Sequence, residues 1–150
     1  YLIDLLRDIG HEAIIWVEYR EDAARLMKLL SHHAVALIGG MTEAARQESI
    51  ESFQRGRVPY LIAHPQSAGH GLTFVNCHYA VFYGLGYSYE LHQQARDRIH
   101  RIGQKTKCTY VYLLAKDTIE QDILGVVRGK CAAAEVAREY LQRHTAGVVR

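Results

Sequence analysis

The stretch Gln93–Gln104, written QQARDRIHRIGQ, is the best-specified part of the chain. Apolar residues in and just before it recur at spacings of four, four and three, as on the buried side of a helix; they are Leu91, Ala95, Ile99 and Ile102. Gln94, Arg98 and Arg101 recur at four and three and form a second row on the neighbouring flank. Gly103 then tolerates the left-handed backbone that stops a helix. These spacings predict a helix, packed on a core, that presents two arginines and one glutamine in a row.

Such a row suits a phosphate group, because guanidinium groups stay charged and offer their donors in a fork. The plainer interpretation is an amphipathic helix whose arginines are solvated or paired with Asp97 and Glu90. For an arbitrary helix the plainer interpretation is favoured, since a charged face is usually only a solvated one. The rest of the chain decides between the two.

Composition limits the class of protein. A chain of 150 residues, 49% hydrophobic and 23% charged, fits one globular domain with a real core, and we expect a single domain over residues 1–150. The net charge of +2 is too small to indicate a nucleic-acid partner by itself. The basic residues are clustered, however, with Asp97 as the only acid among them; they are Arg96, Arg98, Arg101, Lys105 and Lys107.

The three cysteines, Cys77, Cys108 and Cys131, form no C-x-x-C pair. We therefore expect a reducing, intracellular setting, with neither a disulfide framework nor a zinc site. No apolar run is long enough to span a membrane and no signal peptide is visible, so no membrane partner is expected. Because the chain starts at Tyr1 without a methionine and an expected helix begins at once, we expect it to be a fragment of a longer protein.

Short apolar runs alternate with helical patterns along the chain. The runs predict strands at 13–17, 35–38, 60–63, 79–83 and 109–114. Helices are expected at 2–9, at 21–30, from Thr42 as a cap to near Gly56, around Ile119–Leu124 with Asp117 or Thr118 as a cap, and at 132–143. Strands that are apolar throughout and alternate with helices predict an α/β fold, a parallel sheet with helices on both faces.

Two loops that follow expected strands have unusual sequences, and ligands of parallel sheets gather at such places. Gly39-Gly40-Met41-Thr42 opens a helix, so it suits either an anion or an ordinary tight turn with a cap, and the loop alone does not separate the two. The loop 64–71 has small residues and two glycines that suit a phosphate or a ribose, but it is not a complete P-loop. His64 and His70 have no acidic or cysteine partner at ligand spacing, so no metal site is expected.

Hydrolysis of a nucleotide needs a triphosphate cradle, a metal carboxylate and a base that positions water. The sequence contains no P-loop and no Asp-Glu pair after a strand. The arginines of 98–101 therefore look like half of a site whose other half lies elsewhere, which is how an arginine finger works.

Together these segments resemble the second RecA-like lobe of a superfamily 2, Swi/Snf-type helicase-like ATPase, with a variant closer to bacterial or phage members. Residues 94–104 resemble its motif VI and residues 67–73, SAGHGLT, its motif V, although Pro65 and Thr73 stand where threonine and asparagine are usual. Three further segments are similar to the family in the same order; they are 13–20, 39–53 (GGMTEAARQESIESF) and 111–120 (VYLLAKDTIE).

The resemblance implies a three-layer RecA-like fold and a DNA-dependent ATPase or helicase, placed in the cytoplasm. Arg98 and Arg101 would face the γ-phosphate of ATP, with Gln94 setting their geometry and Gly69 and Gly71 lining the cleft. Residues of two loops would contact the backbone of DNA, duplex DNA being favoured; they are Gly39, Gly40, Thr42 and Ser67. ATP and Mg²⁺ would be held mainly by a first RecA-like lobe, so the fragment alone is expected to bind neither and to be inactive. The alternative is a noncatalytic nucleic-acid-binding or protein-interaction module of the same shape.

Overall fold

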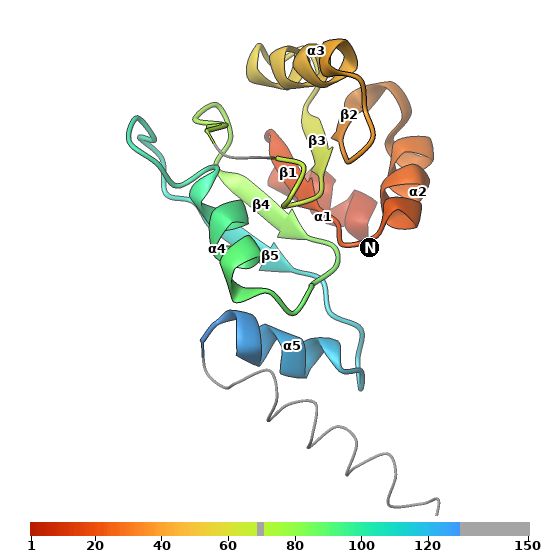
Figure 1. Cartoon of the computed structure of the whole chain (residues 1–150), viewed down its shortest axis with the longest axis vertical. Helices are drawn as coiled ribbons and strands as arrows, with labels where there is room; N and C mark the ends of the chain where they lie inside the picture. Colours follow the sequence, from red (N-terminus) through yellow and green to blue (C-terminus); the bar gives the residue numbers. More distant parts are fainter. Residues whose placement is uncertain (69–70, 130–150) are drawn as a thin grey trace, which may run out of the picture.

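The computed structural model describes residues 1–68 and 71–129 (Figure 1). In chain order the elements are α1 (Leu2–Ile9), β1 (Ala13–Trp16), α2 (Arg20–Leu30), the 3₁₀ turn η1 (Ser31–His33), β2 (Ala34–Leu37), α3 (Glu43–Gln54), β3 (Tyr60–Ala63), β4 (Tyr79–Phe82), α4 (Tyr89–Asp97), β5 (Thr109–Tyr112) and α5 (Glu120–Val127). All five expected strands are confirmed, to within two residues at their ends. The helix expected at 132–143 lies outside the described residues.

The strands form one parallel sheet in the order β2-β3-β1-β4-β5. Its central strand β1 is buried along its whole length, and Ile14 pairs with Leu61 of β3 on one side and Ala80 of β4 on the other. A strand covered on both faces has to be apolar, which is why the inner strands β1, β3 and β4 appear as continuous hydrophobic runs in the sequence.

The side chains of β1 alternate between two hydrophobic cores. Ile14 and Trp16 pack in the core that α3 and α4 cover, with Phe53 and Ala95 as members from the two helices. Ile15 belongs to the opposite core, to which α1 and α2 contribute buried residues; these are Leu2, Leu6, Ala23, Leu26 and Leu30. Helices therefore lie on both faces of the sheet, and the expected three-layer α/β fold is confirmed.

Two helix caps were expected, and one is found. The hydroxyl of Thr42 accepts a hydrogen bond from the amide of Ala45 at 3.3 Å and caps α3 as predicted. The prediction for α5 was wrong, because Ile119 occupies the cap position and makes no side-chain bond. Asp117 instead lies in a turn with φ 58°, and the hydroxyl of Thr118 donates to the carbonyl of Ala115 at 2.9 Å. Both candidate residues therefore belong to the turn that precedes α5 and do not cap the helix.

The end of the arginine-bearing helix also differs from the prediction. Helix α4 ends at Asp97, so Arg98 and Arg101 do not continue the helical row of Gln94. The carbonyl of Arg98 accepts the amide of Phe74 at 2.9 Å and is therefore taken by another segment, so the regular helical ladder stops there. Ile99 is fully buried as expected, but Ile102 is completely exposed and the apolar stripe ends before it.

Candidate functional site: a basic hollow beside the end of helix α4

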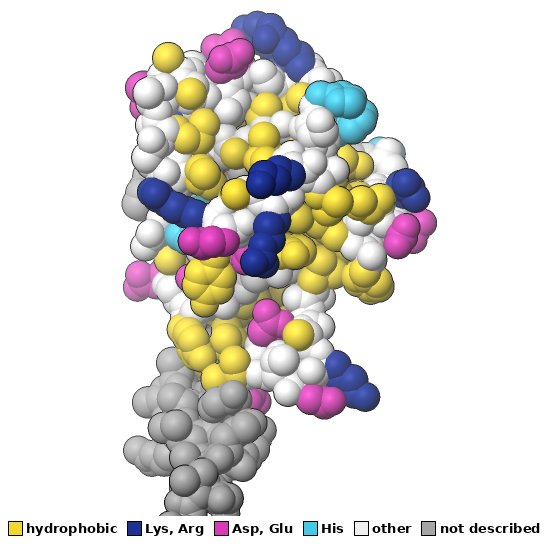
Figure 2. All heavy atoms as spheres, turned by 90° about the vertical axis from the view of Figure 1, so that its right-hand side faces the viewer, with side chains coloured by type: hydrophobic (Ala, Val, Ile, Leu, Met, Phe, Trp, Pro, Cys, Tyr) yellow, Lys and Arg dark blue, Asp and Glu magenta, His cyan; other side chains and the backbone are white. Residues whose placement is uncertain are grey.

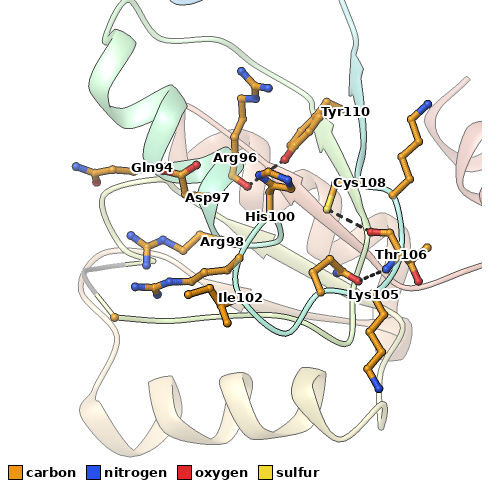
Figure 3. Close-up of a pocket in the computed structure, with 14 residues that line it drawn as sticks. Gln94, Arg96, Asp97, Arg98, His100, Ile102, Lys105, Thr106, Cys108 and Tyr110 are labelled. Carbon is orange, nitrogen blue, oxygen red and sulfur yellow. Dashed lines mark hydrogen bonds between the residues drawn. The ribbon is translucent and has the colours of Figure 1, made fainter.

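A hollow of about 1060 Å³ lies beside the C-terminal end of α4 (Figure 3). Its lining includes Gly71, Gln94, Arg98 and Arg101, so four of the five residues predicted to serve ATP are brought to one place. Gln94 and Arg98 extend toward the same side of the hollow in Figure 3, although only Gln94 belongs to the helix. Gly69, the fifth predicted residue, lies outside the described residues.

Arg98 and Arg101, the two predicted arginines of the hollow, have different surroundings. Arg98 is 7% exposed, and its Nη1 donates to the carbonyl of Leu72 at 2.8 Å. Burial, together with the positive charge of Arg101, lowers the pKa of Arg98 from its ordinary value. Arg101 is exposed, and its Nη1 donates to Oγ1 of Thr73 at 2.9 Å. Arg98 therefore ties the hollow to the fold, whereas Arg101 is the arginine that can reach a ligand.

The segment 71–77, which contains the end of the motif V-like sequence, is bonded to these arginines, and its first residue, Gly71, lines the hollow. It bonds to residues 98–104 through the carbonyl of Leu72, the hydroxyl of Thr73, the amide of Phe74 and the carbonyl of Cys77. The thiol of Cys77 donates to the carbonyl of Tyr79 at 3.1 Å, and burial raises the pKa of this thiol to about 12, so it remains a donor. The segment is thus fixed at its C-terminal end to the first residue of β4.

The opposite part of the hollow carries further positive charge. The guanidinium of Arg96 lies over the ring of Tyr110, 4.8 Å from its centre, and points away from Arg98 in Figure 3. Lys105 and Lys107 also line the hollow, and Asp97 is the one carboxylate among its lining residues. Such a charge balance attracts an anion. The cationic side chains outnumber this carboxylate, so the lining residues favour an anion over a free divalent cation.

A second cluster of polar groups lies where β2, β3 and β1 end side by side. Nη2 of Arg20, after β1, donates to the carbonyl of Gly39, after β2, at 3.0 Å. A Cβ placed on Gly39 would lie 3.1 Å from the same Nη2 and 3.7 Å from Oγ of Ser67, after β3. Gly40, with φ +84°, also lies against the Arg20 side chain. Gly39, Gly40 and Ser67, three of the residues predicted to contact DNA, therefore lie close together around an arginine.

Arg20 was not among the predicted site residues. The feature that could have identified Arg20 is its position directly after a buried strand, at the same edge of the sheet as the two glycines. Arg46 of α3 was missed as well, and it donates to the carbonyl of Ser67, so α3 is tied to this cluster. Thr42 lies at the start of the same helix, where its hydroxyl oxygen serves as the cap and its O–H remains a possible donor.

With this geometry established, the chain can be compared with known proteins. A family model described as "Helicase conserved C-terminal domain" matches residues 1–103. The chain belongs to this family. It is 26% identical over 132 residues to "Uncharacterized ATP-dependent helicase YqhH" of Bacillus subtilis, and the match covers 86% of this chain and 23% of that protein.

Two eukaryotic relatives of this helicase C-terminal domain have names that refer to remodelling or helicase activity. The chain is 30% identical over 128 residues to "Helicase SWR1" of Saccharomyces cerevisiae, covering 82% of this chain and 8% of that protein. It is 28% identical over 133 residues to "Chromatin-remodeling ATPase INO80" of Drosophila melanogaster, covering 86% and 8%. The chain thus spans less than a quarter of the length of these relatives. Because they come from a bacterium, a yeast and an insect, they do not favour the bacterial or phage origin expected from the sequence.

A solved structure supports the fold of the helicase C-terminal domain independently. The C-terminal part of the Fun30 ATPase domain superposes with a TM-score of 0.73 at 24% identity, covering 89% of this chain and 46% of that one. At this identity the match shows the RecA-like fold alone. None of the helices within residues 1–68 and 71–129 combines the length and the hydrophobicity that a membrane span needs.

Proposed function

We propose that this helicase C-terminal domain is the second motor lobe of an ATP-dependent DNA translocase or helicase. The observation that carries the proposal is the position of Arg101, exposed at a basic hollow and held by Thr73. An arginine that is fixed at one nitrogen and free at the others can meet an anion brought to it by a partner lobe. The relatives named as ATP-dependent helicases or remodelling ATPases support the same role.

In this proposal the described residues divide the work on ATP. Arg101 stabilises the charge that develops on the transferred phosphoryl group, and Arg98 keeps the backbone of Arg101 against the segment 71–77. Gln94 and Gly71 line the same hollow and limit the position of the phosphates. Bound ATP supplies the phosphoryl group whose transfer to water releases the energy for movement.

The proposal assigns the remaining parts of the ATPase site to a first RecA-like lobe. The hollow offers mainly positive charge and the sequence has no P-loop, so the proposal places the triphosphate cradle and the ligands of Mg²⁺ on that lobe. This division makes the first lobe an obligatory partner, and the isolated chain hydrolyses no ATP. The cytoplasmic location stays a prediction of the same account.

The cluster at the ends of β1, β2 and β3 is proposed to contact the phosphate backbone of DNA. Gly39 and Gly40 permit close approach of their amides, Thr42 and Ser67 offer hydroxyl groups, and Arg20 adds a positive charge. None of these groups reads base edges, so binding would be independent of sequence. Duplex DNA is the proposed substrate, in keeping with the remodelling relative of the fly.

The test compares ATP hydrolysis by this chain alone with hydrolysis by the two-lobe protein, with and without duplex DNA. We expect no measurable turnover by the chain alone and DNA-stimulated turnover by the two-lobe protein. Robust hydrolysis by the isolated chain would contradict the proposal. The competing function, a noncatalytic module that binds nucleic acid through the Arg20 cluster, predicts DNA binding without turnover in either form.

A further inference from the structure

Gln104 makes an unusually large set of hydrogen bonds for one half-exposed side chain. Its Nε2 lies 2.8 Å from the carbonyl oxygen of Cys77, 3.3 Å from that of Ile99 and 3.4 Å from that of Val75. Its Oε1 accepts the amide of Thr106 at 3.0 Å. Both ends of the side-chain amide are therefore used, and the donor end reaches two separate segments.

The backbone of Gln104 adds a further bond, from its amide to the carbonyl of Arg101 at 3.0 Å. Gly103 lies inside this tight turn with φ +103°, a backbone conformation that favours glycine, and a Cβ there would lie 3.5 Å from Cγ1 of Val75. The turn 101–104 is thus closed by Gln104 and rests on the segment 71–77. The same segment supplies Thr73, to which the Arg101 side chain is bonded.

We propose that Gln104 is a positioning residue for Arg101. It clamps the turn that carries Arg101 onto the segment 71–77, so the arginine is held both through its backbone and through its guanidinium. Position matters here, because a charged group stabilises a transition state only when it is already in place. This inference rests on the proposed function, since it gives Gln104 its effect through the arginine finger.

The segment 71–77 is held on a second side by α3. The segment 71–77 follows the loop of Ser67, and its residues Thr73 and Asn76 are bonded to α3: Gln54 donates to the carbonyl of Thr73 at 3.0 Å, and Asn76 donates to the carbonyl of Phe53 at 3.1 Å. The segment is therefore bonded to α3 as well as to the turn 101–104. The expected consequence of losing Gln104 is a fall in DNA-stimulated turnover with unchanged affinity for ATP.

A double-mutant cycle in the two-lobe protein tests the inference, with kcat, KM for ATP and the thermal unfolding midpoint measured for each variant. Gln104→Ala should lower DNA-stimulated kcat about tenfold, as the loss of a well-placed hydrogen-bond set allows, and leave KM unchanged. If Gln104 acts through Arg101, the double variant Gln104→Ala/Arg101→Ala should be no slower than Arg101→Ala alone. A further multiplicative loss in the double variant would overturn the inference.

Asn76→Ala is the matched control, because it removes an amide-to-carbonyl bond from the same segment but on the side of α3. Near-normal kcat for Asn76→Ala with a low kcat for Gln104→Ala supports positioning, whereas equal losses would mean that Gln104 only stabilises the segment. Gln104→Glu keeps the side-chain size and should lose kcat as well, which covers the case in which the alanine variant fails to fold. Normal turnover of Arg101→Ala would reject the proposed function itself, while loss in Arg101→Ala with normal Gln104→Ala would reject this inference alone.

Discussion

The guanidinium of Arg101 and the hydroxyl of Thr73 form a 2.9 Å hydrogen bond across 28 residues of sequence. This bond joins the segment that resembles motif VI to the one that resembles motif V. It also leaves the remaining nitrogens of an exposed guanidinium available to a ligand. Arg101, the proposed finger, is therefore oriented by Thr73, which belongs to the loop segment 71–77.

Thr73→Val should weaken this orientation without changing the shape of the side chain. We expect DNA-stimulated kcat of the two-lobe protein to fall by about three- to tenfold, because Arg101 loses an acceptor. The unfolding midpoint should hardly change, since the lost bond is at the surface. Thr106→Val makes the same chemical change at a residue that lines the hollow and should retain normal turnover; equal losses in both variants would remove Thr73 from the account.

Ile99 and Ile102 should respond in opposite ways to truncation, although both belong to the same apolar pattern. Ile99 is fully buried, so Ile99→Ala should reduce the free energy of unfolding by about 2–5 kcal/mol. Ile102 is completely exposed, so Ile102→Ala should change it by less than about 0.5 kcal/mol. Urea unfolding of the chain measures both values. A large loss for Ile102→Ala would show that the helix continues in solution.

His92 should make the stability of the domain sensitive to acid. The imidazole is 4% exposed, its Nε2 lies 2.9 Å from the hydroxyl of Tyr112, and burial, with Arg96 and Arg128 nearby, lowers its pKa to about 4. The unfolded chain binds a proton at this residue near pH 6.5, while the folded chain does so only near pH 4. Between these values the unfolded state holds more protons, so stability falls as the pH falls, by roughly 3 kcal/mol from pH 7 to pH 4.

The corresponding experiment measures the free energy of unfolding against pH for His92→Asn and for His100→Asn, whose side chain is exposed. For the His92 variant, the free energy of unfolding should fall less steeply between pH 6.5 and pH 4. For the His100 variant, it should fall as steeply as in the unmodified protein. An unchanged slope in His92→Asn would show that other groups produce the acid sensitivity.

Arg20 should contribute to DNA affinity through charge alone. Arg20→Ala in the two-lobe protein should weaken binding to duplexes of any sequence to a similar extent. The slope of the logarithm of the binding constant against the logarithm of salt concentration should fall by about 1, because one phosphate contact is lost. Arg25→Ala removes an equal charge from the same helix, where Arg25 lies 3.6 Å from Asp22, and should have little effect. Fluorescence anisotropy at several salt concentrations measures both slopes. Equal slopes for Arg20→Ala and the unmodified protein would remove Arg20 from the DNA site.

The sequence predicted the layers of the fold because the inner strands β1, β3 and β4 are almost entirely buried and therefore apolar. The sequence also grouped Gln94, Arg98 and Arg101, which lie close together in the chain after one strand. In the structure all three line one hollow. The sequence placed the end of α4 wrongly because the carbonyl of Arg98 bonds to Phe74, 24 residues earlier, and periodicity does not contain long-range contacts.

Arg20 shows the same limit for the second cluster. It lies 19 residues from Gly39 in sequence, and their contact depends on the sheet order, in which β3 separates β1 from β2. Local spacing identified Gly39 and Ser67 as loop residues that follow strands. Only the arrangement of the strand ends shows which arginine accompanies them.

The central claim is that Arg101 supplies charge to an ATPase site completed by another lobe, and the most direct measurement is the steady-state ATPase of the two-lobe protein carrying Arg101→Ala. We predict a fall in DNA-stimulated kcat on the order of a thousandfold, as for other arginine fingers, with an unchanged unfolding midpoint. Arg96→Ala, which removes an arginine from the same hollow, should retain most of the activity. Near-normal turnover by the Arg101→Ala protein would contradict the account.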